Sequence, residues 1–399
     1  MKTRNIIRKS GQVLISASIL LLFIVPAVAK TVTYIKEYTY TAGDMDSKLS
    51  SRTIALEQVK RLLLEELGTY ILSETTVKDF KVTKDEITSI TSGIVMTVII
   101  DEKWDGKSYY LKAQIKTDVD QLEKSIDRAR RDREKSRNYE DTRRNTEDAL
   151  IEIDRLKKES GNVQGEKVHK EKYAKAVNKL EAMNWFAEGN ALFKLFSADT
   201  NEEAMKAFDK SIEIDPDYAN AYAGRAAIYN HRFEWKKALR ESQQAIKIDP
   251  TLPWAYNCRG NAQRGLRNLK ESIEDFNKAI ELDPVYAWPY ANRSLTYYRL
   301  KNYHQALLDS NKAIELNPSL QRAYLYRGMV HTSMNNYQEA IEDYDRAIKI
   351  DPTISLSYLN RGNVYLKLNK TDQALEDFRK AADLGNDEAK AYLRRKGMR

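Results

Sequence analysis

The chain has 399 residues, 31% of them charged, and a formal net charge of +8. Half of that charge comes from Lys2, Arg4, Arg8 and Lys9, so the chain beyond residue 29 carries a net charge of only +4. A balance this close to neutral argues against a nucleic-acid-binding protein. The single cysteine, Cys258, excludes an intramolecular disulfide, and we expect it to pack within a helix.

Residues 1–29 have the three-part layout of a bacterial secretory signal peptide. A basic start precedes an apolar run from Val13 to Val28, and Ala27-Val28-Ala29 forms a small-x-small cleavage site. The alternative is an uncleaved inner-membrane anchor, because the apolar run is only slightly shorter than a membrane span. No cysteine follows the site, which excludes a lipoprotein anchor. We therefore expect an exported protein of the periplasm or cell envelope.

Residues 30–117 predict a small α+β domain, with one helix on a sheet of about three strands. Thr31–Tyr40 is rich in β-branched and aromatic residues, which favours a strand. Ser50-Ser51 can cap the helix, and we expect Gly68 to mark its end. The apolar face of this helix consists of Leu56, Val59, Leu63, Leu67 and Tyr70.

Two alternating runs, joined by the turn residues Asp105-Gly106, predict a β-hairpin at the end of this domain. The apolar positions of the two runs are Ile94, Met96, Val98 and Ile100, and then Leu111, Ala113 and Ile115.

The phrase Ser-Ser-Arg-Thr-Ile-Ala-Leu-Glu-Gln-Val-Lys-Arg-Leu-Leu-Leu-Glu-Glu-Leu-Gly at 50–68, followed by such a hairpin, resembles the N-terminal domain of flagellar assembly protein T and related small envelope lipoproteins. The resemblance covers less than a quarter of the chain. It implies an envelope context and a role in protein assembly, and it brings no catalytic residues. Arg52 in this phrase is either functional or an ordinary solvated charge of the helix.

Residues 118–181 predict a charged helical linker, either a long exposed helix or a weak coiled coil. Its middle is almost wholly polar, and its alternating charges favour a solvated face with pairs at i,i+4. Gly161 and Gly165 bracket an expected break. A second helix from Lys167 then leads into the rest of the chain through Tyr173, Val177, Leu180 and Met183.

Beyond this linker, five prolines stand 34 residues apart, each closing a phrase such as Glu-Ile-Asp-Pro, and a fixed period of this length predicts stacked repeats. The prolines are Pro216, Pro250, Pro284, Pro318 and Pro352. Columns of Tyr, Gly and Ala recur at the same period, so two helices can approach closely in each unit. Proline ends the second helix, because it has no N–H and disfavours helix in the residue before it.

This order of aromatic, Gly, Ala and Pro resembles the tetratricopeptide repeat, best in Asn-Arg-Gly-Asn-Val-Tyr at 360–365 and Ala-Ile-Glu-Asp-Tyr-Asp-Arg-Ala-Ile-Lys-Ile-Asp-Pro at 340–352. The resemblance covers residues 182–386 and implies an all-α solenoid of six helix-turn-helix units. The first unit has three extra residues, which we assign to a longer turn within Phe196–Asn201. Residues 387–399 are expected to form a capping helix, which an end repeat needs to cover its apolar side.

Two charged columns also recur at the 34-residue period, one of arginines and one of acids. In an antiparallel hairpin they lie at similar heights, so we predict an Arg–carboxylate ladder within or between units. A charged groove is the functional alternative to this structural role, which is favoured because a ligand site rarely repeats in every unit. The ladder residues are Arg225, Glu241, Arg259, Asp275, Arg293, Asp309, Arg327, Asp343, Arg361 and Asp377.

The resemblance also implies that the first helix of each unit lines a concave groove. Asn can bind both N–H and C=O of an extended peptide, and Arg pairs with carboxylates. The candidate groove residues are Asn230, His231, Trp254, Asn257, Asn261, Arg264, Tyr298, Arg299 and Arg322. Leucines further along suggest an apolar part of the ligand, or else are buried under the chain's own tail. They are Leu325, Leu356, Leu359 and Leu366, together with Met329.

We find no pattern typical of catalysis or of metal binding in the sequence. The leading interpretation is therefore a non-enzymatic scaffold of the bacterial envelope, without cofactor or metal, that binds a protein or peptide and no nucleic acid. The alternative is an oligomeric assembly subunit, associated with the envelope membrane, in which the repeats are spacers. An accessory of an envelope hydrolase is less favoured.

Overall fold

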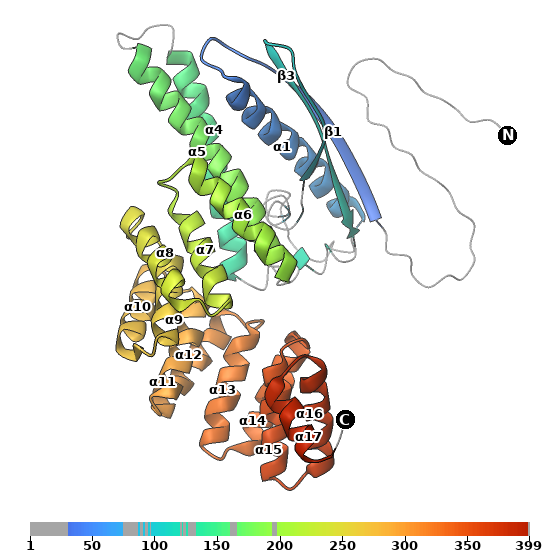
Figure 1. The fold of residues 1–399 in the computed structure, drawn as a ribbon. Coiled ribbons are helices and arrows are strands. Elements are labelled where there is room, and N and C mark those ends of the chain that lie inside the picture. The colour runs from blue at the N-terminus through green and yellow to red at the C-terminus, as the bar shows by residue number, and fades with distance from the viewer. Residues whose placement is uncertain are drawn as a thin grey trace, which may run out of the picture.

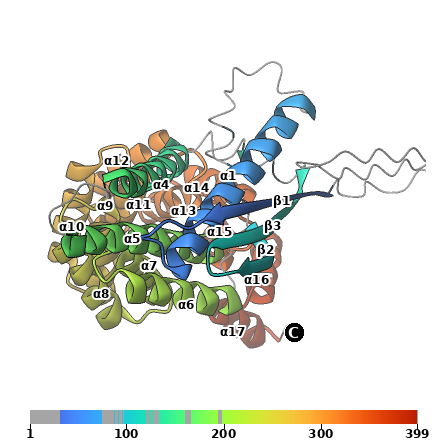
Figure 2. The same cartoon turned by 90° about the horizontal axis from the view of Figure 1, so that it is seen from above.

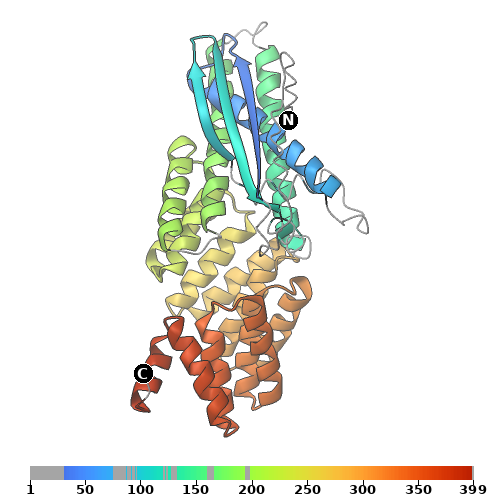
Figure 3. The same cartoon turned by 90° about the vertical axis from the view of Figure 1, so that its right-hand side faces the viewer.

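The computed structural model describes residues 31–74, 97–119, 133–159, 166–193 and 198–397, together with Ile87, Thr91, Val95, Leu122, Ser125 and Ile126. The predicted signal peptide, Ile94, Met96 and the break at Gly161 and Gly165 lie outside the described residues. The described part is elongated, with a sheet and long helices at one end and a stack of short helices leading to the other (Figures 1 and 3).

The N-terminal part is a three-stranded antiparallel sheet with one helix against it, as predicted (Figure 2). The strands β1 (Thr31–Thr41), β3 (Ser108–Asp118) and β2 (Thr97–Trp104) lie in that order, and α1 (Lys48–Glu74) packs on β1 and β3. The buried core between helix and sheet includes Val59, Leu63, Leu67, Leu111, Ala113 and Ile115.

The predicted ends of α1 were wrong on both sides. Ser47, not Ser50, precedes the helix: the Ser47 amide donates to Ser50 Oγ at 2.8 Å and the Ser50 amide donates to Ser47 Oγ at 3.0 Å. This reciprocal pair is a capping box with Ser50 inside the first turn. Gly68 lies buried within the helix, which continues to Glu74. Burial of Ile71 against the sheet outweighs the cost of about 1 kcal/mol for a glycine in a helix.

The hairpin turn forms as expected, because Asp105 Oδ1 accepts hydrogen bonds from the amides of Lys107 and Ser108 at 2.8 and 2.6 Å. Of the apolar positions predicted for the first run of the hairpin, the two that the structure describes do not face the core. Val98 and Ile100 are 51% and 46% exposed on the open side of the sheet, while Ile99 packs on the core. An irregularity in the β2–β3 register follows Ile99 and sets the facing of the strand.

The predicted linker contains two long helices that pack together, α4 (Arg133–Glu159) and α5 (Glu166–Phe193). Their shared cluster of Ile153, Leu156, Tyr173, Val177 and Leu180 also contains Ile54 of α1. The ring Nε2 of His169 in α5 lies 2.5 Å from the carbonyl oxygen of Leu156 in α4. The linker therefore packs against the α+β domain.

From α6 on, the chain is a succession of antiparallel helix pairs, and each pair stacks on its neighbours (Figure 3). Its helices are α6 (Ala198–Ile214), α7 (Ala219–His231), α8 (Trp235–Ile248), α9 (Pro253–Gly265), α10 (Leu269–Leu282), α11 (Ala287–Arg299), α12 (Tyr303–Leu316), α13 (Gln321–Ser333), α14 (Tyr337–Ile350), α15 (Ser355–Lys367), α16 (Thr371–Asp383) and α17 (Asp387–Arg395).

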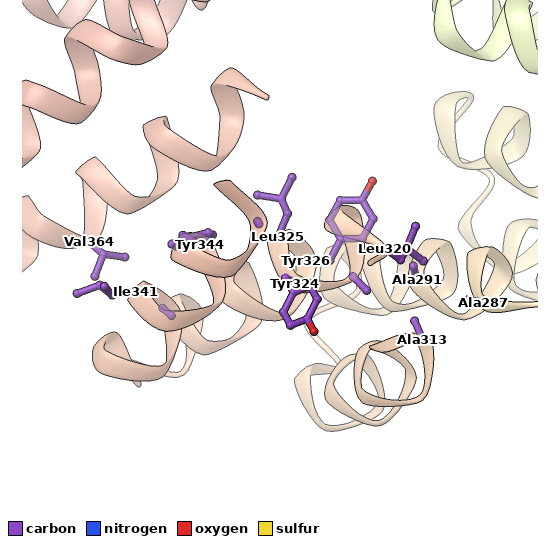
Figure 4. Close-up of a cluster of buried hydrophobic side chains, with 13 residues drawn as sticks. Ala287, Ala291, Ala313, Leu320, Tyr324, Leu325, Tyr326, Ile341, Tyr344 and Val364 are labelled. Atoms are coloured by element: carbon purple, nitrogen blue, oxygen red, sulfur yellow. The ribbon is translucent and has the colours of Figure 1, made fainter. Parts of the chain in front are cut away.

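Small residues allow the two helices of a unit to touch. A Cβ on Gly260 would lie 2.7 Å from the ring of Phe276, and one on Gly328 would lie 2.7 Å from the ring of Tyr344. These rings are fully buried and fill the space between the helices. Figure 4 shows the cluster around Tyr344, which joins residues of successive units.

The two ends of the solenoid differ from its middle. The longer turn predicted for the first unit was wrong in part, because Ala198–Asn201 belong to α6, which has 17 residues where α8 has 14. At the other end, Asn386 accepts a hydrogen bond from the Ala389 amide at 2.9 Å and starts α17. Leu393 of α17 then shares a buried cluster with Phe378, as expected of a capping helix.

Candidate functional site

The first helices of the units form the inner side of the solenoid. The helices α7, α9, α11, α13 and α15 contact one another in succession, whereas the second helices of neighbouring units scarcely touch. A stack whose first helices are closer together than its second helices curves toward the first helices. In Figure 4 the hydroxyls of Tyr324 and Tyr326 lie on opposite sides of α13, so this helix has two distinct faces.

The structure places the ladder arginines directly against the ladder acids, sixteen residues apart and across each hairpin. Arg225 binds Glu241, and the other four pairs are Arg259–Asp275 at 2.5 Å, Arg293–Asp309 at 2.7 Å, Arg327–Asp343 at 2.7 Å and Arg361–Asp377 at 2.6 Å. The acids are at most 5% exposed. Burial opposes the charge of Arg293, but the hydrogen bonds and charge of Asp309 raise the pKa of Arg293 above its ordinary value.

The same arginines also reach the preceding unit. Arg225 binds Asp209 at 2.8 Å, Arg293 donates to Asn277 Oδ1 at 2.5 Å and Arg327 donates to Asn311 Oδ1 at 2.7 Å. Arg361 binds Asp345 in the same way. The ladder therefore links units as well as the helices within them, and its charges are internally satisfied.

Several candidate groove residues hold the inner helices together. Asn230 donates to the carbonyl of Cys258 at 2.8 Å and Arg264 donates to the carbonyl of Asn292 at 2.9 Å, each 28 residues along the chain. Asn257 is 6% exposed and accepts from Asn292 at 3.0 Å. Trp254 packs edge-on to Phe186 of α5, with ring centroids 6.1 Å apart. These contacts leave Asn257 and Trp254 little freedom to reach a ligand.

The other candidates are more open. His231, Arg299 and Arg322 are exposed, while Asn261 and Tyr298 are half-buried. Asn261 Oδ1 accepts from Arg264 at 2.6 Å, and Tyr298 OH accepts from Ser333 at 3.4 Å. Burial lowers the pKa of His231, and the positive charges of Arg322 and Arg232 act in the same direction. The charge of Arg322 on α13 thus acts on α7.

Some of the leucines near the C-terminus are buried under the chain's own tail, and others stay on the groove side, so both expected roles occur. Leu359 and Leu366 belong to the cluster that includes Leu393 of α17, so the chain's own tail contributes to their burial. Leu325 is 3% exposed within the cluster of Figure 4. Leu356 is 38% exposed and stays available on the inner surface.

A cavity of about 270 Å³ lies between α13 and α14, away from the candidate groove residues, and its lining includes Tyr324, Arg327, His331, Glu339 and Asp343. Arg327 and Asp343 already bind each other there. Within the described residues, no group of three His, Cys, Asp or Glu side chains could hold a metal ion. Every helix of the described ranges is too short or too polar to cross a membrane.

Comparison with known proteins identifies the repeats. The tetratricopeptide repeat model matches residues 253–286, 322–354 and 355–384, and a second tetratricopeptide repeat model matches residues 289–320. No curated protein matches the chain. Residues 253–384 are thus tetratricopeptide repeats, and proteins built from such repeats are in general scaffolds for protein–protein interaction.

Several solved structures match much of the chain at low identity. A tetratricopeptide repeat protein from Parabacteroides merdae is 20% identical, covers 63% of this chain and 98% of its own, and has a TM-score of 0.44. PilF of Pseudomonas aeruginosa is 20% identical, with 55% and 99% covered and a TM-score of 0.43. A thermophilic repeat protein of Thermus thermophilus is 18% identical, with 46% and 99% covered and a TM-score of 0.41.

Proposed function

We propose that this protein is a scaffold of the bacterial cell envelope that holds an extended segment of a partner protein on the inner surface of its repeats. The envelope location rests on the signal-peptide layout of residues 1–29. The binding role rests on the contrast between the ladder and the inner surface.

The proposal rests on one observation. The residue type changes from unit to unit at the inner positions, whereas the ladder keeps arginine at its equivalent position. At one inner position the five regular units carry Asn230, Arg264, Tyr298, Thr332 and Leu366, and at the next they carry His231, Gly265, Arg299, Ser333 and Lys367. The ladder has Arg in all five units. Residues that only hold a repeat together recur, so five different side chains at one position point to recognition of a particular partner.

A photo-crosslinking residue at Asn261, on the inner helix α9, tests the proposal in the native envelope. The control carries the same residue at Lys278 on the outer helix α10, where the side chain is 39% exposed. We expect a covalent adduct with a partner protein from position 261 and none from position 278. Adducts from both positions in equal amount, or from position 278 alone, would contradict an inner binding surface.

A second candidate function, an oligomeric assembly subunit, is favoured by the open side of the sheet. Ile35 and Val98 are 50% and 51% exposed there, and both lie opposite Gln114 of β3. Apolar side chains gathered on one face favour self-association. Light scattering on the protein lacking residues 1–29 distinguishes the two: a stable oligomer that the double change Ile35→Lys and Val98→Lys dissolves would support assembly.

A further inference from the structure

The turns inside three successive units give one edge of the solenoid a positive charge. They join the two helices of the second, third and fourth units, and we call their segments, residues 232–237, 266–271 and 300–305, the basic turn edge. These segments contain six lysines and arginines and two acids, a net charge of +4. The turns between units lie at the opposite ends of the helices and contain eight acids and two lysines, in the segments 213–218, 247–252, 281–286, 315–320 and 349–354.

Most cations of the basic turn edge are available to a partner. Arg232 binds Glu202 at 2.9 Å, and Lys237 binds Glu234 at 2.5 Å. The other four cations are exposed, and no acid among the described residues lies within ion-pair distance of them; they are Lys236, Arg267, Lys270 and Lys301. These four charges can therefore attract an anionic surface.

Apolar side chains stand among these cations. Phe233 is 74% exposed and meets Trp235 edge-on, with ring centroids 5.4 Å apart. Trp235 also packs on the next unit, because a Cβ on Gly265 would lie 2.2 Å from its ring. Leu300 of the fourth unit is 45% exposed. The basic turn edge is thus apolar as well as basic.

The residue at the left-handed position of each turn gives a second, independent observation. Glycine or asparagine is favoured there, and the fifth and sixth units have Asn335 and Asn369. The basic turn edge instead has Phe233, Arg267 and Lys301 at this position, all with positive φ. Strain that a chain retains at exposed positions points to a function of the side chains themselves.

We propose that the basic turn edge binds the surface of an anionic lipid membrane, with Phe233 in the headgroup region and the four exposed cations against the lipid phosphates. Aromatic side chains flanked by lysine and arginine are typical of this interface. Each cation near an anionic surface strengthens binding by about fivefold. Three projecting turns suit lipid better than a protein partner, because lipid accepts a projecting side chain without a pocket of matching shape. This goes beyond the proposed function and shares only its envelope location.

Co-sedimentation with lipid vesicles tests the basic turn edge in the full chain lacking residues 1–29, whose apolar run would itself bind lipid. We expect binding to vesicles of equal parts phosphatidylglycerol and phosphatidylcholine. Binding to phosphatidylcholine alone should be at least about tenfold weaker, because the cations then meet no anionic surface. Equal binding to both kinds of vesicle, or binding to neither, would overturn the proposal.

A triple variant separates binding from stability. The changes Phe233→Asn, Arg267→Asn and Lys301→Asn should weaken vesicle binding at least about a hundredfold, since they remove one apolar side chain and two cations. They should also raise the melting temperature, because asparagine is favoured at the left-handed position. Undiminished vesicle binding by this variant would overturn the proposal.

The matched control is Val285→Asn, which replaces a 45% exposed apolar side chain on the opposite, acidic edge. It should leave vesicle binding unchanged, and a loss equal to that of the triple variant would indicate non-specific adhesion and overturn the proposal.

Two further outcomes distinguish the class of partner and the proposed function. Binding to immobilised polyglutamate but not to the vesicles would assign the basic turn edge to an acidic protein and overturn the lipid proposal. Vesicle binding without a crosslink from position 261 would support the lipid surface and refute the scaffold function. A crosslink from position 261 without vesicle binding would refute the lipid surface alone.

Discussion

Arg293 joins two hairpins with one side chain. It binds Asp309 of its own unit at 2.7 Å, and its other guanidinium nitrogen donates to Asn277 of the preceding unit at 2.5 Å. Asp309 is 3% exposed, so its charge depends on this arginine for compensation. One buried pair therefore contributes both to the fold of a unit and to the stacking of two units.

Replacement of Asp309 by alanine should destabilise the protein by about 3 kcal/mol or more, because it leaves a buried guanidinium without its partner. Urea unfolding measures this loss. The control is Glu315→Ala on the same helix, which breaks an exposed pair with Lys312 and should cost less than about 0.5 kcal/mol. Equal losses for the two variants would show that the ladder pairs contribute no more than surface pairs.

The turn within each regular unit contains one residue with positive φ that is not glycine. Lys301 has a φ of 59°, its amide donates to the Tyr298 carbonyl at 2.9 Å, and the Asn302 amide donates to the Tyr297 carbonyl at 2.9 Å. This is a Schellman motif, in which glycine or asparagine is usual at the position of Lys301. The equivalent residues are Phe233, Arg267, Asn335 and Asn369.

Lys301→Asn should therefore stabilise the protein by about 1 kcal/mol, because a left-handed conformation costs about 1–2 kcal/mol for most residues and less for asparagine. The control Lys301→Ala removes the same exposed amine but keeps an ordinary Cβ, and should give no gain. The converse change, Asn369→Ala, should lose about the same amount. A gain with alanine equal to that with asparagine would attribute the effect to charge. Thermal unfolding of the three variants decides this.

Whether a structural feature could be predicted from the sequence depends on whether its pattern occurs once or is repeated. The 34-residue columns predicted the helix pairs, and the spacing of Arg293 and Asp309 predicted a ladder, because repetition averages out the ambiguity of any single unit. The end of α1 could not be predicted from Gly68, since packing against the sheet overrides local propensity. Tyr326 was not among the predicted groove residues. It is the large residue at a position of the 34-residue repeat that is otherwise occupied by Gly224, Cys258, Asn292 and Asn360.

Cys258 should be inert to thiol reagents in the folded protein. Its side chain is 3% exposed, and burial raises the pKa of the thiol to about 12. Compared with an ordinary thiol of pKa about 8.5, its thiolate fraction at pH 8 is about a thousandfold lower. A disulfide reagent should therefore react with Cys258 only after denaturant unfolds the repeats.

The raised pKa of Cys258 also predicts that the stability of the protein falls as the pH rises. Because the folded pKa of Cys258 lies above the unfolded one, its contribution to stability is complete below about pH 8.5 and declines as the pH rises toward the folded pKa of about 12. The decline approaches about 1.4 kcal/mol per pH unit. Unfolding of Cys258→Ala in the same buffers should show a shallower decline, and identical slopes would contradict the shift.

Glu181 should control how firmly the N-terminal domain is held against the repeats. It is 4% exposed on α5, accepts from Thr53 of α1 at 2.6 Å and from Trp185 at 3.1 Å, and lies 3.9 Å from Arg52. Since α5 is also the first helix of the first unit, these bonds tie the sheet domain to the solenoid. Removing them should cost about 1–3 kcal/mol at this contact.

Hydrogen exchange shows which helices lose stability when the bonds of Glu181 are removed. In Glu181→Ala we expect amide protection to fall in α1 and α5 and to stay unchanged in α13–α16, because each repeat contacts only its neighbours. The control Glu171→Ala removes an exposed carboxylate from the same helix and should change neither region. Protection that falls uniformly over all the helices would mean that the domain and the repeats unfold as one unit, and that Glu181 stabilises the whole chain instead of one interface.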